Sequence, residues 1–245
     1  MKVHWDKDEG EARELIAALA GPWLIADAGM CGPDNPSPLG CTAAWSYLVD
    51  GVPVASNQNV IPGPAGNNYG ETMALLLGLR WLYFDSPATL PGYLPVAALN
   101  IASDNLNAQR RVCRLGNTRH PWAGMPENIE RWGRHVLTRV KLGHVVLLKG
   151  HPGPADLENG YKEGWPVHAE HDRLDRLCYT RGQQFYADWL GCHGVAYTRE
   201  KDGQVKTRSN FKSDEAWARH CAKRTVWGER PDLPTPSRSL ENTYG

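Results

Sequence analysis

Four acidic residues and one histidine have the types and surroundings from which a cation-binding site could be built. Asp27 and Asp104 each follow a short apolar run, and Glu71 stands at the head of an apolar helical stretch. Asp175 lies inside a helical pattern, and His151 lies between a glycine and a proline in KGHPG. Grouped carboxylates are the ligands that hard cations such as Mg²⁺ prefer, and imidazole exchanges a proton near neutral pH. Brought together, these side chains could bind cations and transfer protons.

Each acid also fits an ordinary structural role. Asn68, followed three residues later by Glu71, fits a capping box in which the acid also suits the helix dipole. Asp27 and Asp104 fit turn or cap positions, and Asp175 fits a solvated helical position. The choice between the two interpretations depends on whether the elements that carry these residues converge.

Hydrophobic periodicity predicts those elements. Predicted strands lie at 22–27, 42–49, 52–60, 96–103 and 144–149, and predicted helices lie at 8–20, within 66–84, at 107–115, 126–140 and 167–190. Asp50-Gly51 is a two-residue turn of the kind that closes hairpins. Pro53 cannot donate to a ladder, so the third strand is expected at a sheet edge.

The order of these elements predicts an α/β fold with one five-stranded mixed sheet flanked by helices. Three antiparallel strands come first, and two strands joined through helices follow. Side chains at the carboxyl ends of such strands project into a crevice where sites form. Asp27 and Asp104 stand at such ends.

The ordered motifs resemble those of the type 1 ribonucleases H. The resemblance rests on LIADAGM around Asp27, NPSPLG at 35–40, NNYGET around Glu71, IASDN around Asp104, KGHPG around His151 and HDRLDRLC around Asp175. Each motif alone is weak, but the ordered set is specific. It implies a ribonuclease H-like catalytic domain at 22–187, after an N-terminal helical segment at 1–21. A C-terminal extension at 188–245, with a hairpin, a helix and a disordered tail, is expected beyond it.

The resemblance implies an endonuclease that hydrolyses the RNA strand of RNA–DNA hybrids. Asp27, Glu71, Asp104 and Asp175 would hold two Mg²⁺ ions, with Mn²⁺ as a substitute. His151 would assist proton transfer or product departure. Under this interpretation Glu71 is a metal ligand, and its position at a helix start is incidental.

Substrate contacts follow from the same resemblance. Asn67 and Asn68 match residues that contact the RNA strand in the minor groove, where 2′-hydroxyls distinguish RNA from DNA. Asn35 matches a residue that holds a phosphate of the DNA strand, although a turn-forming Asn fits the position equally well. Two other functions share the pattern: a resolvase-like or transposase-like DNA nuclease of the same fold, and a non-catalytic nucleic-acid-binding module.

The sequence departs from the family in several places. Ala28 replaces the usual Gly, and His171 stands where Asn is common. The insertion ADLENGYKEGWPV follows His151 and could be a lid or could loosen the coupling of His151 to the site. Only GNTRHPWAG stands where many bacterial members carry a basic protrusion. Residues 188–245 interleave cations with aromatics, so we expect this extension to grip the substrate instead.

Bulk properties are compatible with this interpretation. The formal net charge is +0, but acidic residues prevail up to residue 103 and basic residues beyond it, as an acidic site and a nucleic-acid-binding surface would require. Six cysteines without a CxxC motif predict reduced thiols and a cytoplasmic location. No run approaches the ~18 apolar residues of a membrane span, so no membrane association is expected, and the sequence indicates no protein partner.

Overall fold

The computed structural model describes residues 1–86, 98–113, 122 and 125–228. The chain forms two compact units, Met1–Gly182 and Gln183–Gly245. The predicted disordered tail, residues 231–245, lies outside the described residues, as does most of the segment GNTRHPWAG. The helix α6 (Ala169–Cys192) contributes residues to both units.

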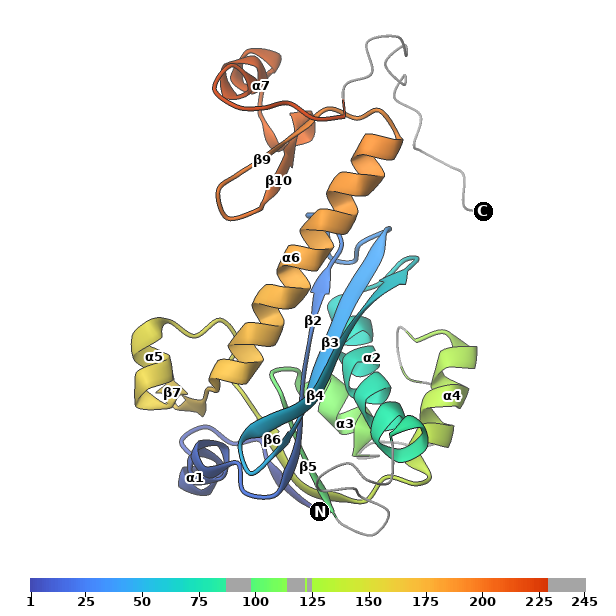
Figure 1. The fold of residues 1–245 in the computed structure, drawn as a ribbon, viewed down its shortest axis with the longest axis vertical. Helices are drawn as coiled ribbons and strands as arrows, with labels where there is room; N and C mark the ends of the chain where they lie inside the picture. The colour runs from blue at the N-terminus through green and yellow to red at the C-terminus, as the bar shows by residue number, and fades with distance from the viewer. Residues whose placement is uncertain (87–97, 114–121, 123–124, 229–245) are drawn as a thin grey trace. The chain divides into compact units, whose positions relative to one another are not determined.

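A six-stranded mixed sheet forms the centre of the first unit, in the order β1-β6-β5-β2-β3-β4 (Figure 1). Its strands are β1 (Lys2–His4), β2 (Pro22–Met30), β3 (Gly40–Val49), β4 (Val52–Pro62), β5 (Leu99–Ser103) and β6 (Leu142–Leu147). The strands β2, β3 and β4 are antiparallel, whereas β5 pairs parallel with β2 and β6 parallel with β5. The expected fold class is confirmed.

The turn between β3 and β4 follows its sequence signature. Asp50 and Gly51 both have positive φ, at 49° and 76°, as a tight hairpin requires. Pro53 lies in β4, which is an edge strand as predicted. Within the six-stranded sheet, periodicity did not predict β1, which pairs parallel with β6 at the opposite edge.

Helices cover both faces of the sheet. On one face α2 (Asn67–Arg80), α3 (Leu106–Val112), α4 (Glu127–Leu137) and the π-helical turn η1 (Trp81–Asp85) pack in one core with Leu24, Trp45 and Ile101. On the other face α1 (Gly10–Ala18) and the first half of α6 pack against Trp23 and Ile25. Consecutive residues of β2 thus enter opposite cores, as the alternation of a strand buried on both faces requires.

The insertion after His151 folds into a short helix, α5 (Pro154–Asn159), and a small hairpin, β7 (Tyr161–Lys162) and β8 (Trp165–Pro166). The hairpin turn is held to the N-terminal segment, because the amide of Asp8 donates to the carbonyl of Gly164 at 2.9 Å. The insertion is therefore anchored in the first unit beside α1.

The second unit contains the end of α6, the hairpin β9 (Tyr197–Arg199) and β10 (Val205–Thr207), a 3-10 turn η2 (Arg208–Asn210) and α7 (Asp214–Cys221). Its small core includes Ala187, Leu190, Tyr197 and Val205. The predicted hairpin and helix are both present. Across the described residues, no helix combines the length and hydrophobicity needed to cross a bilayer.

Candidate active site

Asp27 and Asp104 lie on neighbouring strands at the centre of the sheet. Trp23, Leu24 and Ile25 of β2 pair with Asn100, Ile101 and Ala102 of β5. The same register, continued along both strands, brings Asp27 level with Asp104, which directly follows β5. Asp27 is 3% exposed. At this point β2 has an antiparallel neighbour on one side and a parallel one on the other, the position at which open α/β sheets form their crevice.

Glu71 enters the same site from α2. It lies in the first turns of the helix and is 2% exposed. The start of α2 packs closely on the sheet at Gly70, where a Cβ would lie 3.0 Å from Cβ of Ala28 and 3.3 Å from Cβ of Cys41. This close approach seats Glu71 against Asp27. The capping-box interpretation is wrong: the N-cap residue is Gly66, Asn68 lies inside the helix, and no side chain caps its first turn.

The enclosure of these acids has an electrostatic cost. Burial raises the pKa of Asp27 well above its usual value, and the charges of Asp104 and Asp175 raise it further. Burial, Asp27 and Asp104 likewise raise the pKa of Glu71. Hydrogen bonds from the amide of Ala28 act in the opposite direction on both groups but are outweighed. Bound cations would offset this cost by compensating the negative charge.

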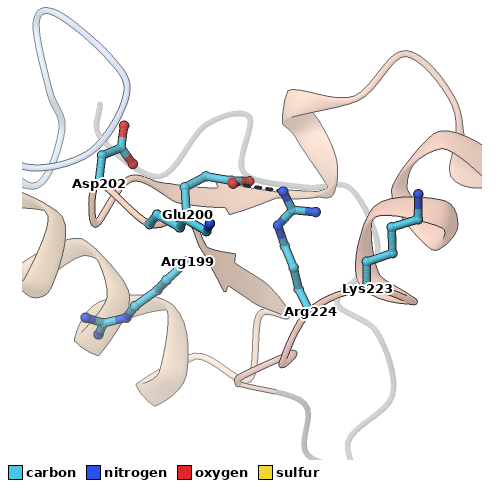
Figure 2. A pocket seen from close by; sticks show the side chains of 6 residues that line it. Arg199, Glu200, Asp202, Lys223 and Arg224 are labelled. Atoms are coloured by element: carbon cyan, nitrogen blue, oxygen red, sulfur yellow. Dashed lines mark hydrogen bonds and ion pairs between the residues drawn. The ribbon is translucent and has the colours of Figure 1, made fainter.

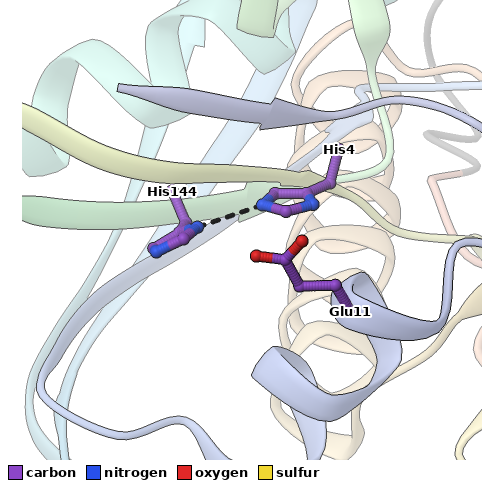
Figure 3. A group of neighbouring side chains, drawn as sticks. All are labelled: His4, Glu11 and His144. Atoms are coloured by element: carbon purple, nitrogen blue, oxygen red, sulfur yellow. Dashed lines mark hydrogen bonds between the residues drawn. The ribbon is translucent and has the colours of Figure 1, made fainter.

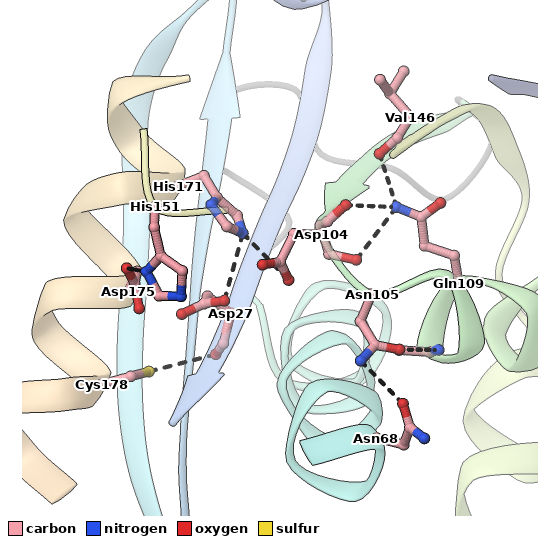
Figure 4. A network of polar contacts seen from close by, with 12 residues as sticks. Asp27, Asn68, Asp104, Asn105, Gln109, Val146, His151, His171, Asp175 and Cys178 are labelled. Atoms are coloured by element: carbon pink, nitrogen blue, oxygen red, sulfur yellow. Dashed lines mark hydrogen bonds and ion pairs between the residues drawn. The ribbon is translucent and has the colours of Figure 1, made fainter. Parts of the chain in front are cut away.

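Asp175 completes the cluster from α6 and links it to His151. His151 Nδ1 lies 2.8 Å from Asp175 Oδ2 in a polar contact, and the side chain of His151 is 82% exposed (Figure 4). The carbonyl of His151 accepts a bond from Lys162 of the insertion. Despite the long spacing in sequence, His151 is therefore in contact with the site.

The loop that carries His151 also touches Asp104. A Cβ placed on Gly150 would collide with Asp104 Oδ2. The contact is with the end of a flexible side chain, so a larger residue at this position would displace the Asp104 carboxylate. This steric contact explains why a glycine precedes the histidine in KGHPG.

Sequence reasoning did not assign His171 to the site, although it is at the centre of it. His171 Nε2 lies 3.4 Å from Asp27 Oδ1 and 3.9 Å from Asp104 Oδ1, and its side chain is 2% exposed. Burial lowers the pKa of His171, although Asp104 and Asp175 oppose the shift. A signal was available, since His171 precedes Asp175 by one helical turn and so shares its face of α6.

The site offers unsatisfied ligand atoms. Among the described residues, Asp27 Oδ2, Glu71 Oε2 and His171 Nε2 are buried without a hydrogen-bond partner. One atom each from Asp27, Asp104 and His171 lie within 4.8 Å of one another. Buried unpaired oxygens beside further carboxylates fit divalent cations, which supply the missing partner and the missing charge.

The predicted substrate-binding asparagines lie together at the start of α2. Asn35 Oδ1 accepts from the amide of Asn67 at 3.2 Å. Asn68 Oδ1 accepts from Nδ2 of Asn105 at 3.1 Å (Figure 4). It also accepts from Nδ2 of Asn107 at 3.4 Å. Asn67 and Asn68 are exposed, so these amides form a polar surface that borders the acids. Asn105 and Asn107 were not identified from the sequence.

The second unit has a hollow of its own, with a volume of about 720 Å³ (Figure 2). It is lined by Arg199, Glu200, Lys201, Asp202, Lys223 and Arg224. Arg224 is paired with Glu200 at 2.9 Å. The lining holds more cations than acids.

The sheet has the strand order and the strand directions of the ribonuclease H-like fold. No protein-family model and no curated protein matches the sequence. Among solved structures, ribonuclease H1 of Halobacterium salinarum is 18% identical over 54% of this chain and 87% of that one, with a TM-score of 0.39.

Two further structures are similar at the same level. The N-terminal ribonuclease H domain of a Mycobacterium tuberculosis protein, solved as a fusion with maltose-binding protein, is 14% identical over 67% of this chain and 97% of that one, with a TM-score of 0.43. The ribonuclease H1 called LC11, solved with an RNA/DNA hybrid, is 15% identical over 50% of this chain and 83% of that one, with a TM-score of 0.36.

Proposed function

We propose that this protein is a metal-dependent endonuclease that hydrolyses the RNA strand of RNA–DNA hybrids. The observation that carries the proposal is the group of buried carboxylates at the centre of a ribonuclease H-like sheet, two of which have oxygens without a partner. Burial and mutual repulsion disfavour the ionised form of these carboxylates. Such a cluster is typical of a functional site, here one that would hold cations next to a phosphodiester.

Asp27, Glu71, Asp104 and Asp175 would hold two Mg²⁺ ions, or Mn²⁺ in their place. Paired ions of this kind supply an activated water and stabilise charge on the leaving oxygen. His171 Nε2 faces Asp27 and Asp104, so this chain presents an imidazole nitrogen beside the oxygens. Nitrogen suits Mn²⁺ and later transition metals better than Mg²⁺, which predicts that Mn²⁺ is an efficient substitute.

His151 has the position of a proton carrier. Its Nδ1 faces Asp175, which fixes the ring, while the rest of the exposed imidazole remains open to solvent. An imidazole that is held at Nδ1 and exposed to solvent at Nε2 can accept a proton at Nε2 and release it to water. This arrangement supports a role in proton transfer or product departure.

The asparagines support the choice of a hybrid substrate. Asn67 and Asn68 present amides beside the acids, where they can donate to and accept from ribose 2′-hydroxyls, the groups that distinguish RNA from DNA. Asn35, whose side chain accepts from the amide of Asn67, would bind a phosphate of the other strand. LC11 ribonuclease H1 was solved with such a hybrid.

The test is cleavage of an end-labelled RNA–DNA hybrid with and without Mg²⁺. Double-stranded RNA, double-stranded DNA and a four-way DNA junction of the same sequence serve as competing substrates. We expect metal-dependent cutting of the RNA strand of the hybrid, loss of cutting in Asp104→Asn, and no loss in Glu127→Gln, a matched acid-to-amide change on exposed α4. Preferential cutting of the junction would establish the DNA-nuclease alternative, and hybrid binding without turnover would establish a binding module.

A further inference from the structure

A second group of potential metal ligands lies where the N-terminal segment joins the sheet (Figure 3). His4 belongs to β1, His144 to β6 and Glu11 to the first turn of α1. One ligand atom from each residue lies within 4.8 Å of the other two. None of these residues belongs to the acid cluster described above.

The sheet register explains why the histidines meet. Lys2 of β1 pairs with His144 of β6, and His4 pairs with Val146. Residues two apart on a strand share a face, so His4 and His144 are diagonal neighbours on the face that α1 covers. The backbone of His144 is also fixed, since its amide donates to Asn100 Oδ1 at 2.8 Å.

The orientation of His4 is that of a metal ligand. Its side chain is fully buried, and its Nδ1 lies 2.5 Å from Glu9 Oε1. A carboxylate on one ring nitrogen fixes the tautomer and leaves the other nitrogen as a lone-pair donor. That nitrogen, Nε2, faces His144 Nδ1 at 3.0 Å. Two imidazole nitrogens on a tetrahedral Zn²⁺ are about 3.3 Å apart, so a small adjustment would admit the ion.

We propose that His4, His144 and Glu11 form a structural site for a nitrogen-preferring divalent cation, with Zn²⁺ as the ion that its ligands fit best. Two imidazoles and one carboxylate supply three ligands, and water supplies the fourth. Because the ligands come from β1, α1 and β6, the ion would fasten the first residues of the chain to the edge of the sheet. Mg²⁺, which prefers oxygen ligands, should not compete.

Lys2 provides an internal competitor. It forms an ion pair with Glu11, and both side chains are about half exposed. An ammonium group beside a ligand carboxylate repels an incoming cation and holds one of the oxygens. Removal of the Lys2 charge should therefore tighten metal binding, although Lys2 itself contributes no ligand.

The competing explanation is a hydrogen bond between two neutral imidazoles that needs no ion. Thermal melting of the full-length protein with added Zn²⁺, in a large excess of Mg²⁺, distinguishes the two explanations. At a Zn²⁺ concentration about 100 times Kd, linkage predicts a rise in Tm of roughly 5–10 °C. With Co²⁺ in place of Zn²⁺, the site should give the visible d–d absorption of a low-coordinate ion with nitrogen ligands.

Variants test the ligand assignment. Because the acid cluster also offers an imidazole nitrogen to such ions, the ligand variants are made in an Asp104→Asn background. There His144→Ala and Glu11→Gln should remove the Tm rise and the Co²⁺ spectrum, and Glu9→Gln should weaken binding by roughly 10- to 100-fold. Lys2→Gln should tighten it. In the same background one control should retain the full response: His193→Ala, which removes an exposed histidine of the second unit.

Two results would overturn the proposal: no Zn²⁺-dependent Tm rise in Asp104→Asn, or an equal rise in Asp104→Asn with and without His144→Ala. If His144→Ala fails to fold, the exposed Lys2→Gln and Glu11→Gln variants still decide, because the proposal requires them to change affinity in opposite directions.

Discussion

At the scale of single residues, the acid cluster suits cation binding but lowers the stability of the metal-free fold. The pKa values of Asp27 and Glu71 are raised in the folded state, first by burial and then by neighbouring acids. A raised carboxyl pKa gives stability that is complete at low pH and is lost as pH rises through the folded value. The ionised, metal-free site should therefore weaken the fold near neutral pH and above.

Asp27→Asn should accordingly separate activity from stability. We expect hybrid cleavage to be abolished, while the Tm in EDTA at pH 8 rises by several degrees, since about 1 kcal/mol corresponds to roughly 2–4 °C in a chain of this size. Differential scanning calorimetry and a cleavage assay measure the two effects. Wild-type cleavage in this variant would remove Asp27 from the metal ligands, and a lower Tm in EDTA would contradict the electrostatic argument.

Asp175 differs from Asp27 in its surroundings. Its side chain is 24% exposed and contacts His151, whereas the side chain of Asp27 is 4% exposed. Water can replace the oxygen of an exposed metal ligand more readily than that of a buried one. Asp175→Ala should therefore reduce Mg²⁺-dependent turnover less than Asp27→Asn does. Mn²⁺ should restore part of the loss. Turnover is measured for each metal; unchanged Mg²⁺ activity would mean that Asp175 is not the fourth ligand.

At the scale of elements, close approach of backbones aligns the site. Gly70 lets α2 settle on β2 and β3, and Gly150 lets the histidine loop settle on Asp104. Neither constraint requires a charged residue. Because glycine carries no reactive group, the sequence alone does not reveal the roles of Gly70 and Gly150. The packing of the elements does.

Gly150→Ala should impair cleavage more than stability. The added methyl would displace the end of a flexible side chain, Asp104, rather than backbone, so we expect a small change in Tm but a large loss of turnover. Gly191→Ala is the matched control, because a Cβ there meets no atom within 4 Å and alanine favours a helix. Equal turnover in the two variants would show that the Gly150 loop does not position Asp104.

Sequence patterns predicted the elements of the sheet well where they were long or punctuated. The Asp50-Gly51 turn and Pro53 fixed the hairpin and its edge strand. β1 was missed, because three residues are too few to show a period. His171 was seen only as a departure from a family pattern; its role depends on burial between Asp27 and Asp104, which no local pattern carries. The asparagine contacts at the start of α2 depend likewise on tertiary proximity.

At the scale of the whole molecule, the two units have different charge. The first holds the acid cluster, and the second has the hollow lined by Lys201 and Lys223 among other charged residues. We propose that the second unit supplies the cationic grip, as expected from its sequence, in place of the basic protrusion that many bacterial ribonucleases H carry. Cations and aromatics together suit phosphates and bases.

Lys201→Gln combined with Lys223→Gln tests this grip. We expect weaker binding of hybrid and a shallower slope of log affinity against log salt, because fewer counterions are released, while saturated turnover and Tm change little. Lys141→Gln, at an exposed position of the first unit, is the control. Fluorescence anisotropy across a salt series measures the slope; an unchanged slope would assign the second unit a role other than substrate binding.

The three residues of β1 also bear on solubility. An uncovered sheet edge offers unpaired amides and carbonyls to any extended chain, and cells must prevent such edges from recruiting one another. At one end of this sheet Pro53 interrupts the donor row of β4. At the other end, the apolar run of β6 would lie open if β1 did not pair along it. We therefore expect the residues of β1 to limit self-association. Their loss would leave the acid cluster in place but would expose β6 to strand pairing with another molecule.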